Sequence, residues 1–172
     1  MDRGCRTNKC VLTTAGMYAD KDALTKLLDI RIKMYMHQHG KTMSTAAVAQ
    51  LLSVTLYGRR FFPLYTFNCL GGIDEDGRGV VYSYDAVGSV ERVQYSATGG
   101  GQTLIQPLLD NQLGWKNAKV AKPKLSLEET LDLVKDAFAS AGERDITTGD
   151  WVDISIITKD GVREERFALK ED

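Results

Sequence analysis

Residues 59–89 read RRFFPLYTFNCLGGIDEDGRGVVYSYDAVGS, and this stretch predicts a β-hairpin. Two runs rich in aromatic and aliphatic residues, 65–73 and 80–84, lie on either side of a polar segment, 74–79. Acidic residues and glycines are typical of tight turns, because glycine adopts positive φ angles at little cost. We therefore expect the two runs to pair as antiparallel strands.

The sequence on either side of the hairpin predicts helices and further strands. Leucines recur at helical spacing before the hairpin, and Ser126 stands three residues before Glu129, the spacing of a capping box that begins a helix. In order, we predict a strand (11–15), a helix (20–38), a helix between Ser44 and Gly58, the hairpin, a strand (92–97), a helix (104–109), a helix from Ser126 to about Gly142, and a strand pair (151–158 and 162–169). Neighbouring hairpins with intervening helices indicate an α+β fold with antiparallel sheets.

The composition indicates one globular domain and excludes several partners. The chain has 172 residues, of which 43% are hydrophobic, and this is enough for a core. Its net charge of −1 argues against a nucleic-acid partner, since such binding needs concentrated positive charge. No apolar run approaches the roughly 20 residues of a membrane span, so we expect no membrane partner. The three cysteines lack the spacing of a metal site or a disulfide framework, and we expect an intracellular protein.

Four motifs resemble one family. They are RRFFP (59–63), GGIDEDGRG (71–79), VYSYD-x-VGS (81–89) and PLLDNQ (107–112). The sequences of these motifs resemble those of the beta subunits of the 20S proteasome. Within that family they are most similar to the non-catalytic type-1 branch, at the sixth beta position. The resemblance extends from about Val11 to Asp172.

The resemblance implies a fold and a set of partners. The family fold is a four-layer αββα sandwich of the N-terminal-nucleophile hydrolase type, and the first strands of that fold have no counterpart here. We expect a divergent segment over residues 1–10 and a single, incomplete beta-subunit domain over residues 11–172. Expected partners are other proteasome alpha and beta subunits in stacked rings, located in the cytoplasm and nucleus, with no cofactor.

The same resemblance implies that this chain is not itself an enzyme. Active relatives use an N-terminal threonine as nucleophile, freed by cleavage of a propeptide. Thr13 and Thr14 lie inside a predicted strand, so we interpret them as strand residues and expect no catalytic residue. Two alternatives stay open: an active peptidase whose threonine lies in upstream sequence, and a truncated isoform without function.

Four positions match functional positions of active relatives, and each has a structural alternative. Gly16 matches an oxyanion-hole glycine or simply ends a strand. Gly100 lies where relatives have Ser-Gly near the nucleophile, or forms a tight turn between helix and sheet. Asp145 and Thr148 resemble the pair that supports the terminal amine, and we expect Asp145 to accept hydrogen bonds from nearby backbone N–H groups.

Two further candidates concern neighbouring molecules. By resemblance, Asp85 lies near the substrate channel of an adjacent subunit, where its carboxylate would accept hydrogen bonds from a peptide. The alternative is a turn residue at the end of a strand. A second candidate is the sequence Arg59, Arg60, Phe61 and Phe62, whose residue types are enriched in interfaces, the alternative being a partly buried entry to the hairpin.

Metal binding is not expected. His37 and His39 are two residues apart, and side chains at that spacing point away from each other on a helix. The acidic segment 74–77 lacks the later glutamate of a calcium loop and is interpreted as a turn.

Overall fold

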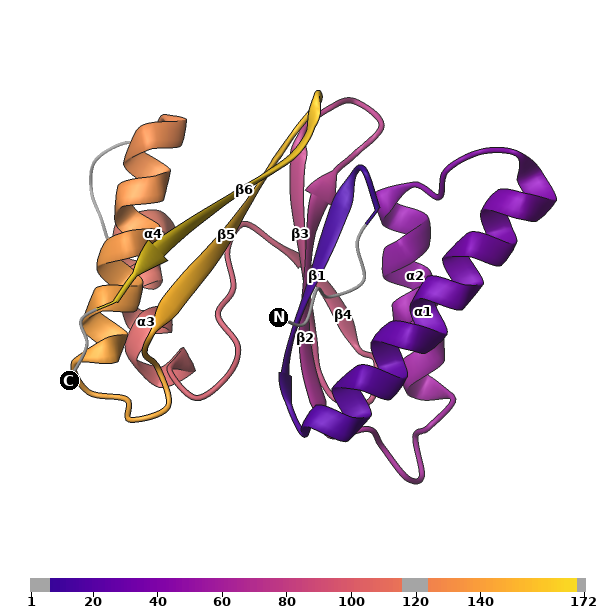
Figure 1. Cartoon of the computed structure of the whole chain (residues 1–172), viewed down its shortest axis with the longest axis horizontal. Coiled ribbons are helices and arrows are strands. Elements are labelled where there is room, and N and C mark those ends of the chain that lie inside the picture. Colours follow the sequence, from indigo (N-terminus) through magenta and orange to yellow (C-terminus); the bar gives the residue numbers. More distant parts are fainter. Residues whose placement is uncertain (1–6, 116–123, 170–172) are drawn as a thin grey trace. The chain divides into compact units, whose positions relative to one another are not determined.

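The computed structural model describes residues 7–115 and 124–169 and confirms an α+β chain (Figure 1). Residues 1–6 of the predicted divergent segment lie outside this range. The elements are β1 (Cys10–Gly16), α1 (Tyr18–His39), α2 (Thr45–Tyr57), β2 (Thr66–Ile73), β3 (Gly79–Tyr84), β4 (Val90–Val93), α3 (Gln102–Leu109), the π-helical turn η1 (Asp110–Gly114), α4 (Leu127–Gly142), β5 (Trp151–Thr158) and β6 (Gly161–Ala168).

The chain divides into two compact units. The first comprises Met1–Gln94 and Ser155–Glu164, and the second comprises Tyr95–Ile154 and Glu165–Asp172. The single domain expected over residues 11–172 stays a prediction.

The first unit contains an antiparallel sheet with the strand order β1-β2-β3-β4. The predicted hairpin is confirmed, because β2 pairs with β3 from Cys69 opposite Ser83 to Ile73 opposite Gly79. Its turn is closed by a hydrogen bond from the Asp74 N–H to the Arg78 carbonyl (2.9 Å).

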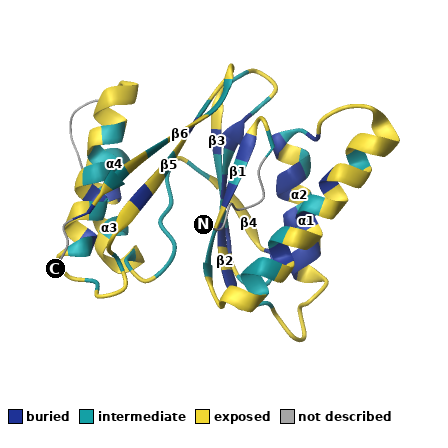
Figure 2. Ribbon diagram, in the orientation of Figure 1, coloured by how far each residue is buried: buried dark blue, intermediate teal, exposed yellow. Residues whose placement is uncertain are grey.

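Helices α1 and α2 cover one face of this sheet (Figure 1). Their inward faces are buried, as the dark blue segments of Figure 2 show. The core joins leucines of both helices to the inward residues of the strands: Leu24, Leu28, Leu52, Leu56, Leu12, Leu70 and Tyr84. The leucines at helical spacing and the alternate residues of the strands therefore face each other and form one apolar layer.

Capping residues set the boundaries of three helices. Ser44 begins α2, since its hydroxyl accepts a hydrogen bond from the Ala47 N–H (3.2 Å). Gly40 ends α1 at φ 63°, a left-handed conformation that favours glycine. Ser126 and Glu129 form the predicted capping box of α4.

A close backbone contact fixes the start of α2 against the sheet. The Thr45 hydroxyl donates to the Ile73 carbonyl at 2.6 Å. A Cβ at Gly72 would lie 2.5 Å from Thr45 Cγ2 and 2.7 Å from Cys10 Cβ. Only a glycine fits between the helix and the strand at this point.

The strand predicted over residues 92–97 is wrong in its position, because β4 spans Val90–Val93. Pairing begins directly after the loop that the Asp85 N–H closes on the Ser89 carbonyl (3.1 Å). The Ala97 N–H donates instead to Gln106 Oε1 of α3 (3.0 Å). The C-terminal end of the segment 92–97 is therefore not paired with β3.

The second unit contains α3, η1 and α4, and strands β5 and β6 form the predicted two-stranded hairpin. Helix α3 contains Pro107 and passes directly into the π-helical turn. Among the helices of the described ranges, none is both long and apolar enough for a membrane span.

Candidate functional site

Three of the predicted positions, Gly100, Asp145 and Thr148, lie together in the second unit. Thr148 donates from its hydroxyl to Asp145 Oδ2 at 2.6 Å. Thr147 donates to Oδ1 from its backbone N–H (3.0 Å) and from its hydroxyl (2.8 Å). A Cβ at Gly100 would lie 2.7 Å from the Thr147 hydroxyl and 3.2 Å from Asp145 Oδ2. The glycine turn before α3 therefore lies directly against the loop that follows α4.

The predicted bond from a backbone N–H to Asp145 is thus confirmed, and it has an electrostatic effect. The Thr148 hydroxyl, followed by the Thr147 backbone N–H and hydroxyl, lowers the pKa of Asp145 because these donors stabilise the carboxylate. The carboxylate is ionised at neutral pH. All of these donors belong to its own loop, so the arrangement closes a turn, and support of an amine stays a prediction.

Gly16 lies in the first unit, at the end of β1. Its φ of 123° is a conformation that side chains rarely adopt, and a Cβ there would overlap the carbonyl oxygen of Tyr65. That carbonyl accepts the Met17 N–H at 2.9 Å. Gly16 therefore has a structural reason to be glycine at the passage from β1 to α1, and its role as an oxyanion donor remains untested.

Thr13 and Thr14 are strand residues, as interpreted from the sequence. The Thr13 hydroxyl donates to the Cys69 carbonyl on the neighbouring strand (3.1 Å). The Thr14 hydroxyl is buried and has no hydrogen-bond partner among the described residues. A threonine nucleophile needs an adjacent base, and neither hydroxyl contacts one in the described part of the chain.

A buried polar residue that the sequence interpretation missed lies opposite Thr14. Asn68 is fully buried and donates its amide to the Thr66 hydroxyl (3.1 Å), while its Oδ1 has no partner within the described residues. The signal was present in the sequence, since Asn68 is two residues before the inward-facing Leu70 and so shares its face of the strand.

Asp85 forms a turn at the end of β3. Its Oδ1 accepts from the backbone N–H groups of Val87 (3.0 Å) and Ser89 (2.7 Å), which is the Asx-type arrangement given as the alternative. The residue is exposed, and no described residue donates to Oδ2. Its contact with a substrate in a neighbouring channel is untested.

The segment from Arg59 to Phe62 lies on the surface between α2 and β2. Phe61 and Phe62 are 97% and 82% exposed, so the alternative of a partly buried hairpin entry is wrong for both rings. Whether the segment forms an interface stays a prediction.

The described residues also contain an open cavity in the second unit that the sequence did not indicate. It has a volume of about 560 Å³ and lies beside the end of α4, between Ile146, Asp150 and Phe167. Its lining includes the carboxylates of Glu143 and Asp150 but, over the described ranges, no histidine, lysine or cysteine.

Metal-binding clusters of histidine, cysteine and carboxylate residues are not found among the described residues. The ring of His39 instead packs against that of Tyr35, with centroids 4.4 Å apart. The acidic residues 74–76 belong to the hairpin turn, as predicted.

Comparisons with known proteins agree with the four motifs. A family model described as "Proteasome subunit" matches residues 6–157. Proteasome subunit beta type-1-B of Carassius auratus is 50% identical over 167 residues, which cover 96% of this chain and 70% of the relative. Proteasome subunit beta type-1 of Arabidopsis thaliana is 53% identical, with coverages of 96% and 76%.

A more distant relative is also a proteasome beta subunit. Proteasome subunit beta type-6 of Saccharomyces cerevisiae is 46% identical over 172 residues, which cover 94% of this chain and 71% of the relative. Family model and relatives agree over nearly the full length, and the α+β elements match the fold expected from that resemblance. The chain therefore belongs to the proteasome subunit family and, within it, to the beta type-1 subunits.

Proposed function

We propose that this chain is a non-catalytic structural subunit of the 20S proteasome core particle. It assembles with other alpha and beta subunits in stacked rings and, through the assembled particle, takes part in ATP- and ubiquitin-dependent protein degradation. The observation that carries this proposal is the identity of about one half to beta type-1 subunits over 96% of the chain.

The non-catalytic part of the proposal is supported by the contacts of the candidate residues. Thr13 uses its hydroxyl to bond the neighbouring strand, and Asp145 uses its carboxylate to close its own loop. Each group thus takes part in hydrogen bonds that stabilise the fold. A catalytic group would instead face a substrate or a base.

A smaller proposal concerns Asp85. Its Oδ1 closes the turn after β3, whereas its Oδ2 accepts no hydrogen bond from the described residues. An exposed carboxylate oxygen held in a fixed orientation is suited to a peptide N–H. We propose that it faces peptide bound to an adjacent subunit, and an Asp85→Asn variant of the assembled particle would then show a raised KM for that subunit's substrates.

Assembly and catalysis are tested in one experiment. The chain, tagged at its C-terminus, is expressed in cells of the source organism, and lysate is separated by sedimentation and treated with an electrophilic probe for N-terminal threonines. We expect the chain to sediment with large particles whose other beta subunits carry the probe, while the chain carries none. A chain found only as a free species would overturn its role as a subunit, and a labelled chain would show it to be a peptidase.

The location in the cytoplasm and nucleus is likewise a proposal, since it follows from assembly into that particle. Fluorescence microscopy of the tagged chain is expected to show both compartments. Signal confined to another compartment would contradict it.

A further inference from the structure

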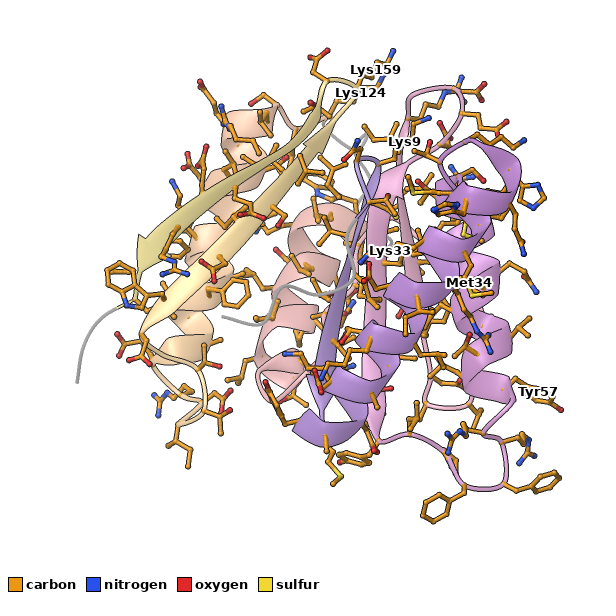
Figure 3. All side chains as sticks on the ribbon, turned by 45° about the vertical axis from the view of Figure 1, so that its right-hand side comes forward. Lys9, Lys33, Met34, Tyr57, Lys124 and Lys159 are labelled. Carbon is orange, nitrogen blue, oxygen red and sulfur yellow. The ribbon has the colours of Figure 1, made fainter. Side chains whose placement is uncertain are left out.

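An exposed aromatic group lies at the C-terminal end of α2 and in the loop that follows it. We call Tyr57, Arg59, Arg60, Phe61 and Phe62 the aromatic knob. The two phenylalanine rings are 97% and 82% exposed, and Tyr57 is 63% exposed. Figure 3 shows the labelled Tyr57 side chain pointing away from the ribbon at the end of α2. Large rings in solvent at adjacent positions are typical of a binding surface, because isolated exposed apolar residues are common but grouped ones are not.

The backbone under these rings is held by consecutive hydrogen bonds. The N–H groups of Arg59, Arg60 and Phe62 donate to the carbonyls of Leu56, Tyr57 and Arg59, at 2.9, 2.9 and 3.0 Å. Leu56 is fully buried, which fixes the start of the segment to the core. Beyond Pro63, the Tyr65 N–H donates to Asp20 Oδ2 at 2.8 Å. The rings are therefore presented on a loop whose backbone is already held, so little backbone conformational entropy is lost when they bind.

The charge of the aromatic knob is positive and uncompensated. Between Val54 and Tyr65 the charged residues are Arg59 and Arg60, and no carboxylate is present. Within the described residues neither guanidinium pairs with an acid, and that of Arg60 lies over the Phe61 ring, 5.9 Å from its centroid. A partner must therefore supply an apolar recess and negative charge around it.

We propose that the aromatic knob inserts into an apolar recess rimmed by carboxylates on a different subunit of the same particle. This inference rests on the proposed function, because it presumes that the chain assembles. A second copy of this chain in a twofold contact is the less favourable occupant, since it would bring the arginines of both copies together. Phenylalanine, tyrosine and arginine are the residue types that carry most binding energy in such contacts.

The first test compares tagged variants by the fraction that sediments with large particles. For the double variant Phe61→Ala and Phe62→Ala we expect a loss of incorporation of about tenfold or more, as for residues that anchor an interface. The matched control is Ile146→Ala, which also removes a fully exposed apolar side chain but lies in the second unit. Its incorporation should stay within about twofold of wild type, as for an apolar residue outside the contact.

A folding defect of the double variant can be distinguished from an assembly defect. Because both rings are exposed, the double variant should keep the circular dichroism spectrum and protease resistance of the wild-type chain. If the wild-type chain enters particles and the double variant enters equally well, the aromatic knob is not an interface and this inference fails. If the wild-type chain never enters particles, the proposed function itself fails.

A second test identifies the occupant. A photo-crosslinking phenylalanine analogue at position 61 should give one adduct with another subunit, at a peptide that contains aspartate or glutamate beside apolar residues. The variant Arg59→Glu and Arg60→Glu should lower this yield, whereas Arg59→Lys and Arg60→Lys should retain most of it. An adduct with a second copy of the chain, or particles without any adduct, would overturn the proposed contact.

Discussion

Replacing Thr14 by valine is expected to stabilise the chain. The Thr14 hydroxyl is buried in β1 without a hydrogen-bond partner among the described residues, so folding removes it from water without compensation. An unpaired buried hydroxyl costs about 1–3 kcal/mol, and valine puts a methyl group of the same shape in its place. Strand propensity is nearly unchanged, since both residues are β-branched.

The size of the effect follows from this cost. A gain of about 1 kcal/mol divided by a urea m-value of about 2 kcal/mol/M raises the unfolding midpoint by about 0.5 M. The control is Thr13→Val, which removes the 3.1 Å bond to the Cys69 carbonyl and should lower the midpoint. Fluorescence-monitored urea unfolding measures both.

The outcome also bears on catalysis. A fall of the midpoint in Thr14→Val would refute the reasoning, because it would show that the hydroxyl has a partner, such as an enclosed water molecule. Particles that contain Thr14→Val should keep all their peptidase activities. Loss of one activity in intact particles would restore Thr14 as a candidate nucleophile.

Three further predictions concern stability. Gly16→Ala should lower the free energy of unfolding by about 2–4 kcal/mol, because a Cβ strains the backbone and breaks the contact between β1 and the residue before β2; an unchanged urea midpoint would contradict this. Tyr84→Phe should cost about 1 kcal/mol, since the buried hydroxyl donates to the Ala49 carbonyl at 2.8 Å, whereas Tyr82→Phe should cost little, and equal midpoints for the two variants would be the contrary result. Asp145→Asn should be less stable than wild type at pH 7. Because folding lowers the pKa of Asp145, the ionised carboxylate adds to the free energy of unfolding above about pH 4, and this stabilisation is lost as the pH falls through the lowered pKa. Thermal unfolding at pH 7 and pH 3 measures the difference in melting temperature between wild type and this variant. A difference that is as large at pH 3 as at pH 7 would contradict the stabilising role of the carboxylate.

Local sequence signals predicted most of the elements. Gly40 and Ser44 mark helix ends through their own backbone and side-chain chemistry, and the turn after Asp74 carries its glycine. Such signals act within a few residues, so they can be read without knowing the fold. The position of β4 depended instead on where the Asp85 loop closes. The loss of pairing near Ala97 depended on a hydrogen bond to the side chain of Gln106, nine residues further along the chain.

The candidate site was predicted less completely, because its geometry depends on distant segments. The bond to Asp145 was expected from its local sequence, whereas its closeness to Gly100 comes from the packing of segments some 45 residues apart. Asn68 was missed although the alternation of the strand places it on the inward face with Leu70, because a polar residue in a strand is ordinarily expected on the exposed face. For Phe61 and Phe62 the sequence left an exposed interface segment and a partly buried hairpin entry both open, and the structure shows both rings exposed.

The contact at Gly72 has a consequence for genetics. Helix α2 approaches β2 so closely there that a methyl group would act as a wedge between Thr45 and Cys10. A glycine-to-alanine change needs a single nucleotide substitution, and it would weaken the attachment of α2 without removing any core side chain. Because native proteins are stable by only about 5–15 kcal/mol, we expect such a change to lower the melting temperature of the chain, so that the Gly72 codon is a candidate site for temperature-sensitive alleles.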